Sequence, residues 1–355
     1  MKTLKRVNVR SEKIADYQIE SRGKIKDLKK NSYCVVEGYS IGGEAPKSFI
    51  KVYEHQNLSK SNSKKANKKL KQQKKANTKT WTLYIAKAGH KWYPIESITE
   101  HLIARIGSET GLNMAHSRLA KIDNQVRFLS KYFIDPYKQE LVHGTDILAA
   151  YVDDRPFIHE IQKNKREPEF FTLETVVDAI KHMFPEHYNE IIEQYFLMLI
   201  FDAWVGVQDR HFDNWAVVRS IYGTNAPYFS PIYDSARGLF WNEREEKIII
   251  WYKYKQLESQ IERLINTSMP QVGIMAGEKT NHFRLIEEIL SDKFIPIKSK
   301  ASTIFSPHGL AKTQKMIEAE FDGLLSKRRI YLINKCLHIR YLKLKDLFVG
   351  KGIIF

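Results

Sequence analysis

The apolar residues in the first third of the chain are grouped into short segments that predict a small β-rich lobe. Each segment is rich in Val, Ile, Tyr, Phe or Trp and is bounded by turn-forming residues or, in one place, by a lysine-rich tract. The expected strands are 33–39, 48–53, 81–87, 116–122 and 125–134. Asp123 and Asn124, between the last two segments, are typical of a two-residue hairpin turn.

A single helix is expected between the third and fourth strands. Within 95–110 the apolar side chains from Ile98 to Ile106 recur at three- and four-residue spacing, which is the period of one helix face. Gly111 fits a helix end because glycine readily adopts the left-handed backbone conformation found there. The first lobe is therefore expected to run strand, strand, strand, helix, strand, strand.

From about residue 135 the pattern changes to helical periods. The expected helices are 172–183, 187–205, 282–290 and 313–347, and short strands are expected only at 216–219 and 247–251. This order predicts an α+β protein with a small β-rich lobe followed by a larger, mainly helical lobe. Its expected parts are an N-terminal extension at 1–30, the small lobe at 31–134 and the helical lobe at 135–355.

The formal net charge of +16 is concentrated in one tract of the small lobe. Residues 57–80 contain nine lysines, two leucines, no acidic residue and no aromatic residue. So little apolar surface cannot offset the entropy of ordering, and we expect this tract to be a mobile insertion. One interpretation is a solvated segment that aids solubility, and the other is contact with nucleic acid or anionic lipid.

Composition argues against several classes of protein. Cys34 and Cys336 are the only cysteines and stand far apart, so neither a disulfide framework nor a cysteine zinc site is expected. The longest apolar run, 195–207, is too short to span a bilayer and contains Asp202. The basic N-terminus lacks the apolar core of a secretory signal. We therefore expect a soluble protein in a reducing cytoplasm.

Several polar residues of the second lobe fit the chemistry of phosphoryl transfer. Asp209 and Asn214 stand five positions apart, which is the spacing of the base and a metal-binding amide in a kinase catalytic loop. Asp234 follows after a short apolar stretch and offers the oxygen ligands that Mg²⁺ prefers. His211 is a candidate to stabilise the loop or the transferring phosphoryl group, although a lone histidine is more often structural. This spacing alone arises by chance in many proteins. The residues upstream of it therefore decide how strongly it indicates a kinase catalytic loop.

The small lobe offers a phosphate cradle and a cation. Residues 40–47, with the sequence SIGGEAPK, lie between two expected strands, where glycines let the backbone approach a phosphate closely. The cradle candidates are Ser40, Ile41, Gly42, Gly43 and Lys47. The segment is not a Walker A loop, since the Gly-Lys-Ser/Thr ending is absent. Lys87 ends an apolar strand and Glu100 stands one turn into the following helix, so the two are expected to pair.

Taken in order, these motifs resemble the HipA-like serine/threonine kinases. The resemblance is carried by SIGGEAPK, WTLYIAK, ESITEHLIARIGSETGL, RFLSKYF, DRHFDN and PIYD, and it covers roughly residues 33–240. It implies a two-lobed protein-kinase-like fold and an enzyme that uses ATP and Mg²⁺. The region before the phosphate loop is shorter in this chain than in full-length HipA toxins. In this respect the chain is similar to the short members of the family, including HipT-type toxins and a secreted kinase.

The resemblance also implies a role for each motif. The loop 40–47 would cover the nucleotide phosphates, and Ser40 would be a site of autophosphorylation. Residues 128–133 would be the hinge that contacts adenine. The remaining implied roles are phosphate binding for Lys87 with Glu100 as its partner, adenine contact for Lys131, Tyr132 and Phe133, catalysis for Asp209 with His211, and Mg²⁺ binding for Asn214 and Asp234.

Two departures and two alternatives stay open at this point. Val207 stands where family members usually have Asn, and the lysine-rich insertion interrupts the small lobe.

The expected partners are a protein substrate and, if the chain is a toxin, a separately encoded antitoxin. The other expectation is an effector secreted without a classical signal. The segment Asp209-Arg210-His211-x-x-Asn214 is also similar to the loop of phosphoinositide kinases, so a lipid or small-molecule kinase is one alternative. A pseudokinase or basic nucleic-acid-binding module is the other.

Overall fold

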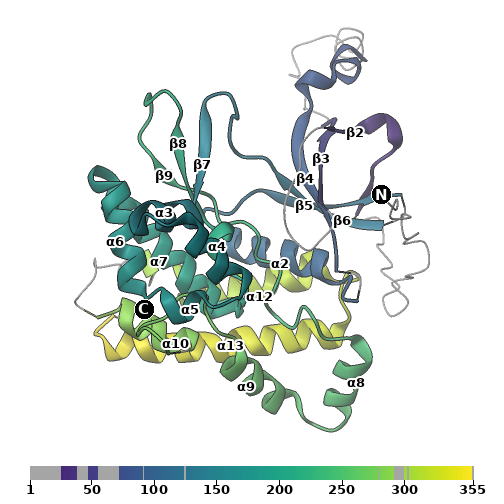
Figure 1. Cartoon of the computed structure of the whole chain (residues 1–355). Helices are drawn as coiled ribbons and strands as arrows, with labels where there is room; N and C mark the ends of the chain where they lie inside the picture. The colour runs from purple at the N-terminus through teal and green to yellow at the C-terminus, as the bar shows by residue number, and fades with distance from the viewer. Residues whose placement is uncertain are drawn as a thin grey trace, which may run out of the picture.

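The computed structural model describes residues 25–37, 47–54, 72–90, 92–123, 125–278, 280–291, 300–301 and 304–353. Within these ranges the chain forms a β-rich N-lobe and a larger, mainly helical C-lobe (Figure 1). The α+β class and the two-lobed arrangement predicted from the pattern are thus confirmed. The cradle candidates Ser40, Ile41, Gly42 and Gly43 lie outside the described residues.

The N-lobe contains a six-stranded sheet with the order β1-β5-β6-β4-β3-β2. Its strands are β1 Lys26–Asp27, β2 Tyr33–Val35, β3 Lys47–Val52, β4 Thr82–Ala88, β5 Ser117–Ile122 and β6 Gln125–Lys131. All neighbouring pairs are antiparallel except β1 and β5. Ile122 pairs with Gln125, so the predicted two-residue hairpin turn is confirmed.

Helix α2, Glu96–Glu109, packs against β5 and β6 of this sheet. Its face from Ile98 to Ile106 is buried, as the spacing predicted. After the helix, Gly111 has a positive φ of 86°, which a residue with a side chain adopts only at a cost. This helix matters for function because it carries Glu100 under the end of β4.

Two boundaries in the N-lobe differ from the prediction. The expected extension ended at residue 30, but β1 at Lys26–Asp27 pairs with β5 and its neighbours Ile25 and Leu28 are buried. The expected mobile insertion ended at residue 80, but residues 72–76 are helical. Trp81 Nε1 donates a hydrogen bond of 3.1 Å to the Lys74 carbonyl, so this end of the tract is held by an aromatic residue that lies outside it.

The C-lobe consists of helices around a central buried helix, with one small antiparallel sheet. The sheet has the order β7-β8-β9, with β7 Gln139–His143, β8 Ala216–Ser220 and β9 Tyr228–Phe229. The helices of the C-lobe are α3 Gly144–Val152, α4 Arg155–Lys163, α5 Glu167–Phe170, α6 Leu173–Met183, α7 Tyr188–Val205, α8 Glu245–Lys253, α9 Leu257–Thr267, α10 His282–Ile289, α12 Pro307–Phe321 and α13 Lys327–Gly350. Short 3-10 turns occur in the N-lobe at η1 Lys30–Ser32 and η2 Thr78–Thr80. In the C-lobe they occur at η3 Pro185–His187 and η4 Phe212–Asn214.

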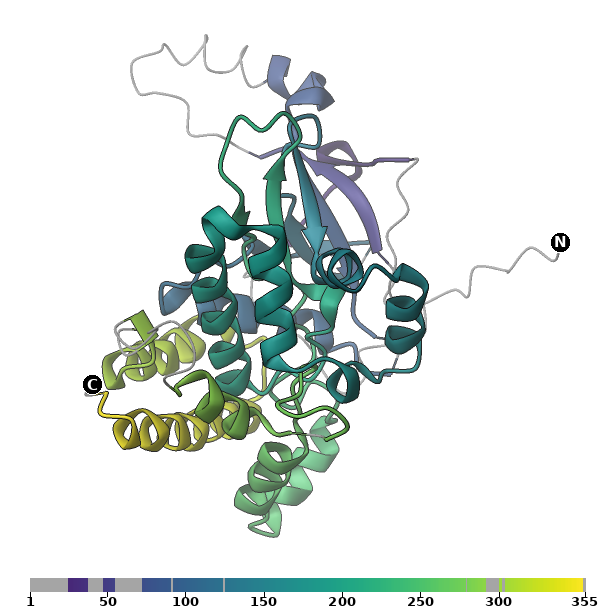
Figure 2. The ribbon, with the colours of Figure 1, turned by 60° about the vertical axis from the view of Figure 1, so that its left-hand side comes forward.

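Helix α7 is the structural centre of the C-lobe. From Tyr195 to Val205 every residue is buried, because α6, α10 and α13 pack around the helix (Figures 1 and 2). Trp204 Nε1 donates to the Leu337 carbonyl of α13 at 3.0 Å, which satisfies its one polar atom. In the described part of the chain, no helix is long and apolar enough to cross a membrane.

Two elements of the C-lobe were predicted wrongly. Residues 247–251 form part of helix α8 and not a strand; Ile248 and Trp251 are buried at helical spacing, and Glu245 and Glu246 stand in its first turn. The single helix expected at 313–347 is two helices, α12 and α13, because the chain turns at Gly323, whose φ is 77°.

Candidate active site

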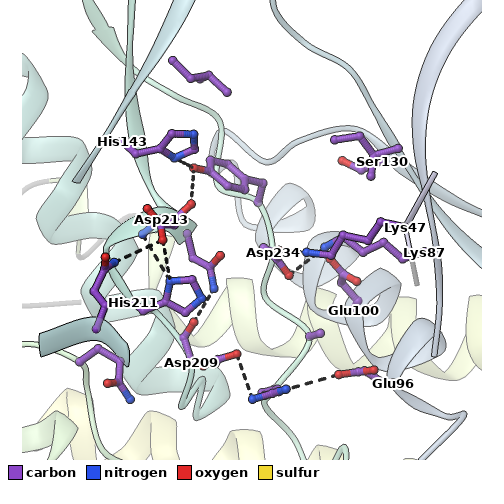
Figure 3. A pocket seen from close by; sticks show the side chains of 18 of the residues that line it. Lys47, Lys87, Glu96, Glu100, Ser130, His143, Asp209, His211, Asp213 and Asp234 are labelled. Atoms are coloured by element: carbon purple, nitrogen blue, oxygen red, sulfur yellow. Dashed lines mark hydrogen bonds and ion pairs between the residues drawn. The ribbon is translucent and has the colours of Figure 1, made fainter. Parts of the chain in front are cut away.

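A cavity of about 770 Å³ lies between the two lobes. Its N-lobe wall includes Ile85 and Lys87 of β4, and its C-lobe wall includes Asp209 and His211. The close-up view shows charged side chains from both lobes facing one another across this space (Figure 3). The segments that the sequence predicted to cooperate are thus brought to one cleft.

Lys87 connects the two lobes through carboxylates. Its Nζ lies 2.6 Å from Glu100 Oε1 of α2 and 2.8 Å from Asp234 Oδ1 of the C-lobe. Lys47 is opposite Lys87 in the β3–β4 register, and its Nζ lies 3.3 Å from Asp234 Oδ2. The predicted pairing of Lys87 with Glu100 is present, and Lys47 joins it as a second cation on Asp234 (Figure 3).

Burial and charge together set the ionisation of this cluster. Burial by itself would raise the pKa of Asp234, but Lys87 and Lys47 outweigh it and hold that pKa well below its usual value. Burial would lower the pKa of Lys87, but Asp234 and Glu100 outweigh it and raise that pKa, so Lys87 is a permanent cation. Burial raises the pKa of Glu100 to about 7, against the opposing effect of Lys87.

The catalytic loop candidate follows directly from the end of α7. Gly206, with φ of 69°, ends the helix, and the loop closes in the turn η4. Arg210 is 4% exposed and donates two hydrogen bonds to Asp202 of α7, at 2.8 and 2.9 Å. A bidentate pair of this kind fixes the guanidinium plane, so the loop is attached rigidly to the central helix.

The same guanidinium also holds the Asp234 segment. Arg210 donates to the carbonyl oxygens of Asn214 at 2.9 Å and of Tyr233 at 2.6 Å, and to Ser235 Oγ at 2.7 Å. Asp234 itself has a positive φ of 52°, a conformation that Asp tolerates better than most residues. One buried arginine therefore sets the relative position of the loop and of Asp234.

Asp209 lies at the cavity with its carboxylate partly exposed. Its carbonyl oxygen accepts a hydrogen bond of 2.6 Å from Asn214 Nδ2, which closes the loop across the predicted five-residue spacing. Its Oδ2 lies 3.2 Å from Arg237, and Arg237 Nε lies 3.9 Å from Glu96 of α2. Arg237 and Glu96 were not marked by the sequence, because neither belongs to a recognisable motif.

Val207 stands where family members usually have Asn, and side chains from other parts of the chain bind the backbone of its segment. The Val207 side chain is buried, and its carbonyl oxygen accepts a bond of 2.9 Å from His282 Nε2 of α10. Burial, with the nearby Arg340 charge, lowers the pKa of His282 to about 3, so the ring is neutral. Gln271 Nε2 donates to the Gln208 carbonyl at 2.8 Å. Side chains from more than sixty positions away thus support this part of the loop.

His211 has a local role in the loop. Its Nδ1 accepts a hydrogen bond of 3.3 Å from the Asp213 backbone N–H, and the ring lines the cavity. Asp213 in turn accepts hydrogen bonds from Thr145 at 2.5 Å and from Gln162 at 3.3 Å. The turn η4 is therefore linked to the helices α3 and α4.

The segment expected to be the adenine-contacting hinge lies at the edge of the cavity. Lys131, Tyr132 and Phe133 all line it, and the Tyr132 backbone N–H is bonded to the Leu83 carbonyl at 2.9 Å. The Phe128 ring lies beneath Lys87, with the ammonium 5.6 Å from the ring centroid. These residues join the end of β6 to the C-lobe.

The donor set near Asp234 fits Mg²⁺. Asp234 is held ionised, and Asn214 uses its amide N–H on Asp209, which leaves its amide oxygen as an acceptor. No group of three or more His, Cys, Asp or Glu able to hold a metal occurs among the described residues. A hard cation at Asp234 and Asn214 would therefore share its coordination with water and phosphate oxygens, as Mg²⁺ usually does.

A second buried acid at the cavity, after Glu96, was missed by the sequence. Glu167, at the start of α5, lines the cavity and is only 3% exposed. Burial raises the pKa of Glu167 to about 7, and the charges of Asp209 and Asp213 add to the rise. A glutamate in a charged segment between two helices carries no signal of burial, so only the structure reveals it.

The two lobes, with the paired Lys87 and Glu100 at the cleft between them, form a kinase-like fold. Residues 39–292 match the family model of the HipA-like C-terminal domain, and the chain therefore belongs to the HipA-like family. The resemblance inferred from the motif order is confirmed by this match.

The fold is shared with a solved structure. The chain is similar to the proinflammatory kinase CtkA of Helicobacter pylori, with 15% identity, a TM-score of 0.63, and coverage of 93% of this chain and 98% of that chain. It also matches HipA of Shewanella oneidensis MR-1, solved with HipB and operator DNA, with 12% identity, a TM-score of 0.38, and coverage of 74% of this chain and 58% of that chain. No curated protein matches the chain in sequence.

Proposed function

We propose that the protein is a serine/threonine protein kinase that transfers the γ-phosphate of ATP to a protein hydroxyl. The observation that carries the proposal is the contact of Lys87 with Glu100 and with Asp234, at 2.6 and 2.8 Å, because it joins both lobes across one cleft. In kinases the same three kinds of residue hold the phosphates and the metal. The family match supports a kinase in general, and the hydroxyl specificity is our proposal.

Each residue has a defined part in this mechanism. Asp209, whose carboxylate borders the cavity, would accept the proton of the attacking hydroxyl. Lys87, held by Glu100, would bind the ATP phosphates, and Lys47 would stand beside it at the end of the phosphate loop. Mg²⁺, when bound by Asp234 and Asn214, would neutralise charge on the phosphate oxygens.

Arg237 would orient the base in the same mechanism. Its guanidinium lies 3.2 Å from Asp209 Oδ2, so it would hold the carboxylate in one orientation. Lys131, Tyr132 and Phe133 would contact adenine from the hinge.

Turnover of labelled ATP tests the proposal. The wild-type protein is incubated with ATP, Mg²⁺, a mixture of protein substrates and phosphoinositide vesicles, in parallel with Asp209→Asn. Label on serine or threonine that is lost in Asp209→Asn supports the proposal. Label on lipid alone would establish the lipid-kinase alternative, and equal labelling by both proteins, or by neither, would refute a catalytic role for this cleft.

Autophosphorylation at Ser40 is a further part of the proposal. Residue 40 lies seven positions before Lys47, whose ammonium contacts Asp234 in the cleft. A phosphate on Ser40 would add roughly −2 charge near the site of the ATP phosphates and so repel the nucleotide. Intact mass after incubation with ATP measures the modification, and unchanged autophosphorylation of Ser40→Ala would contradict the assignment.

The biological setting is the last part of the proposal. We propose a bacterial toxin or effector that acts on a protein substrate, with a separately encoded antitoxin if it is a toxin. Phosphoproteomics of cells that express wild-type or Asp209→Asn protein would identify the substrate. A small helix-turn-helix protein encoded next to the gene would support the toxin role.

A further inference from the structure

Helix α8 exposes a cluster of large apolar side chains. Ile249, Ile250, Tyr252 and Tyr254 are all more than 40% exposed, and we call these four residues the α8 patch. Ile249 and Ile250 lie on the side of the helix away from the buried Ile248 and Trp251, Tyr252 lies on its flank with its ring 6.1 Å from that of Tyr331 of α13, and Tyr254 caps the C-terminal end of the helix. Single exposed apolar residues are common, but a group of four within six positions is typical of a contact surface.

The orientation of the helix is fixed by buried contacts on its other side. Glu245, at the start of α8, accepts hydrogen bonds of 2.6 Å from Arg329 Nε and from Ser326 Oγ. Arg329 is 1% exposed and also donates to the Phe240 carbonyl at 3.1 Å. These contacts fix which side of α8 faces the lobe, so Ile249 and Ile250 stay exposed in the fold.

Cations surround the α8 patch. The Lys253 ammonium lies 5.5 Å from the Tyr254 ring centroid, and the Arg328 guanidinium lies 5.9 Å from that of Tyr252. Lys253, Arg328 and the neighbouring Lys255 form no ion pair with a described residue. Glu246, in the first turn of α8, is an exposed acidic residue of the same helix. The surface thus combines exposed isoleucine and tyrosine side chains with an excess of positive charge.

The α8 patch lies on a projection of the C-lobe. Helices α8 and α9 extend away from the rest of the lobe in both views, at the opposite end of the molecule from residues 72–80 (Figures 1 and 2). A projecting helix can reach a flat surface without interference from the rest of the lobe. The described end of the lysine-rich tract lies too far away to share the same contact.

We propose that the α8 patch binds the surface of an anionic lipid bilayer. Tyrosine side chains favour the membrane–water interface, where the ring is in contact with acyl chains and the hydroxyl with water. The two isoleucines would bury apolar surface between the headgroups, while Lys253, Lys255 and Arg328 approach lipid phosphates and carboxylates. Each cation near such a surface adds to the attraction, and the whole-chain charge of +16 acts in the same direction. The chain would lie on the bilayer without crossing it.

Co-sedimentation with lipid vesicles tests this surface. The probes are phosphatidylcholine vesicles with and without phosphatidylserine, and the protein is the full chain. We expect wild-type protein to sediment with the phosphatidylserine vesicles and to be released by added salt. The double variant Ile249→Ser/Ile250→Ser removes most of the apolar burial, so its partition should fall roughly tenfold or more. Lys253→Glu/Lys255→Glu should reduce it similarly by reversing two charges.

A matched control distinguishes binding through the α8 patch from non-specific binding of vesicles by exposed apolar residues. Ile221 is 48% exposed on the turn between β8 and β9, almost as exposed as Ile250 at 49%, so Ile221→Ser should leave vesicle binding unchanged. Circular dichroism and Tm check that every variant is folded. A folded variant with altered binding then reports on the surface and not on stability.

Each remaining outcome would overturn the proposal. Wild-type protein that does not sediment with phosphatidylserine vesicles would do so, as would full binding by Ile249→Ser/Ile250→Ser. Equal binding to neutral vesicles would contradict the role of the cations. A dimer in size-exclusion chromatography that Ile249→Ser/Ile250→Ser converts to monomer would show that a second copy covers the α8 patch. None of these measurements depends on ATP turnover, so they stand apart from the proposed kinase activity.

Discussion

Replacement of Glu167 by glutamine should remove a loss of stability that the wild-type protein undergoes as pH rises from 5 to 8. The Glu167 carboxyl is almost wholly buried, and its Oε2 has no hydrogen-bond partner among the described residues. Burial raises the pKa of Glu167 from its usual 4.5 to about 7, with Asp209 and Asp213 adding to the rise while its own backbone N–H and Lys165 oppose it. The folded protein therefore disfavours the charged form.

The pKa shift gives the sign and size of the effect. Between about pH 4.5 and 7 the unfolded chain has already lost this proton while the folded protein retains it, so stability falls as pH rises through this window. Above about pH 7 both states are ionised and the loss is complete. Glutamine does not titrate, so the free energy of unfolding of Glu167→Gln minus that of wild type should increase by about 2 kcal/mol from pH 5 to pH 8.

Urea unfolding followed by tryptophan fluorescence at pH 5, 6, 7 and 8 measures this difference. Any constant cost of burying the glutamine amide cancels when values at different pH are compared. Glu169→Gln is the matched control, because Glu169 lies on the same helix in a partly exposed ion pair with Arg166 and should give a flat difference. A flat difference for Glu167→Gln as well would refute the reasoning. An acid that costs stability beside Asp209 is typical of a functional site.

The remaining predictions concern the loop anchor, the lobe contact and acid stability. Arg210→Met leaves Asp202 buried without its partner and should cost about 3–5 kcal/mol in urea unfolding, whereas Asp202→Asn/Arg210→Met should recover part of that loss; equal costs would contradict the coupling. Lys87→Met should lower kcat/KM for ATP turnover on the order of 10²-fold or more, with the exposed Lys138→Met as control, and retained turnover would rule out Lys87 as the phosphate cation. Burial lowers the pKa of His101 from 6.5 to about 4, so protonation of the unfolded chain should reduce stability by about 3 kcal/mol as pH falls from 6.5 to 4. His101→Gln should flatten that part of the pH profile, and an unchanged slope would show that other groups cause it.

The features that the sequence predicted correctly depend on short-range patterns. The α2 face from Ile98 to Ile106 is a helical period, and the Ile122–Gln125 hairpin is set by a two-residue turn. Asn214 reaches Asp209 because five residues complete one turn of the loop. Such features are decided by backbone sterics and local spacing, which any window of the sequence contains.

Pairs that are distant in sequence were decided by tertiary packing. His282 supports Val207 from another helix, and Arg237 reaches Asp209 from the segment after Asp234. No local pattern indicates such partners, since the energy of a buried hydrogen bond depends on which groups the fold excludes from water. Asp202 illustrates this, because in sequence it is one charge in an apolar run and in the structure it is the anchor of Arg210.

Helix α8 shows the same division most directly. The run 247–251 contains three isoleucines and a tryptophan, which favour a strand when local preference alone is considered. In the fold, Glu245 is bound by Ser326 and Arg329 of the C-terminal region, and Ile248 and Trp251 are buried one helical turn apart. The sequence by itself determined the two-lobed class, the helix α2 and the pairing of Lys87 with Glu100. Tertiary structure decided the conformation of α8, the burial of Glu167 and the anchoring of the loop, because burial and ion pairing between distant segments outweigh local propensities of less than about 1 kcal/mol per residue.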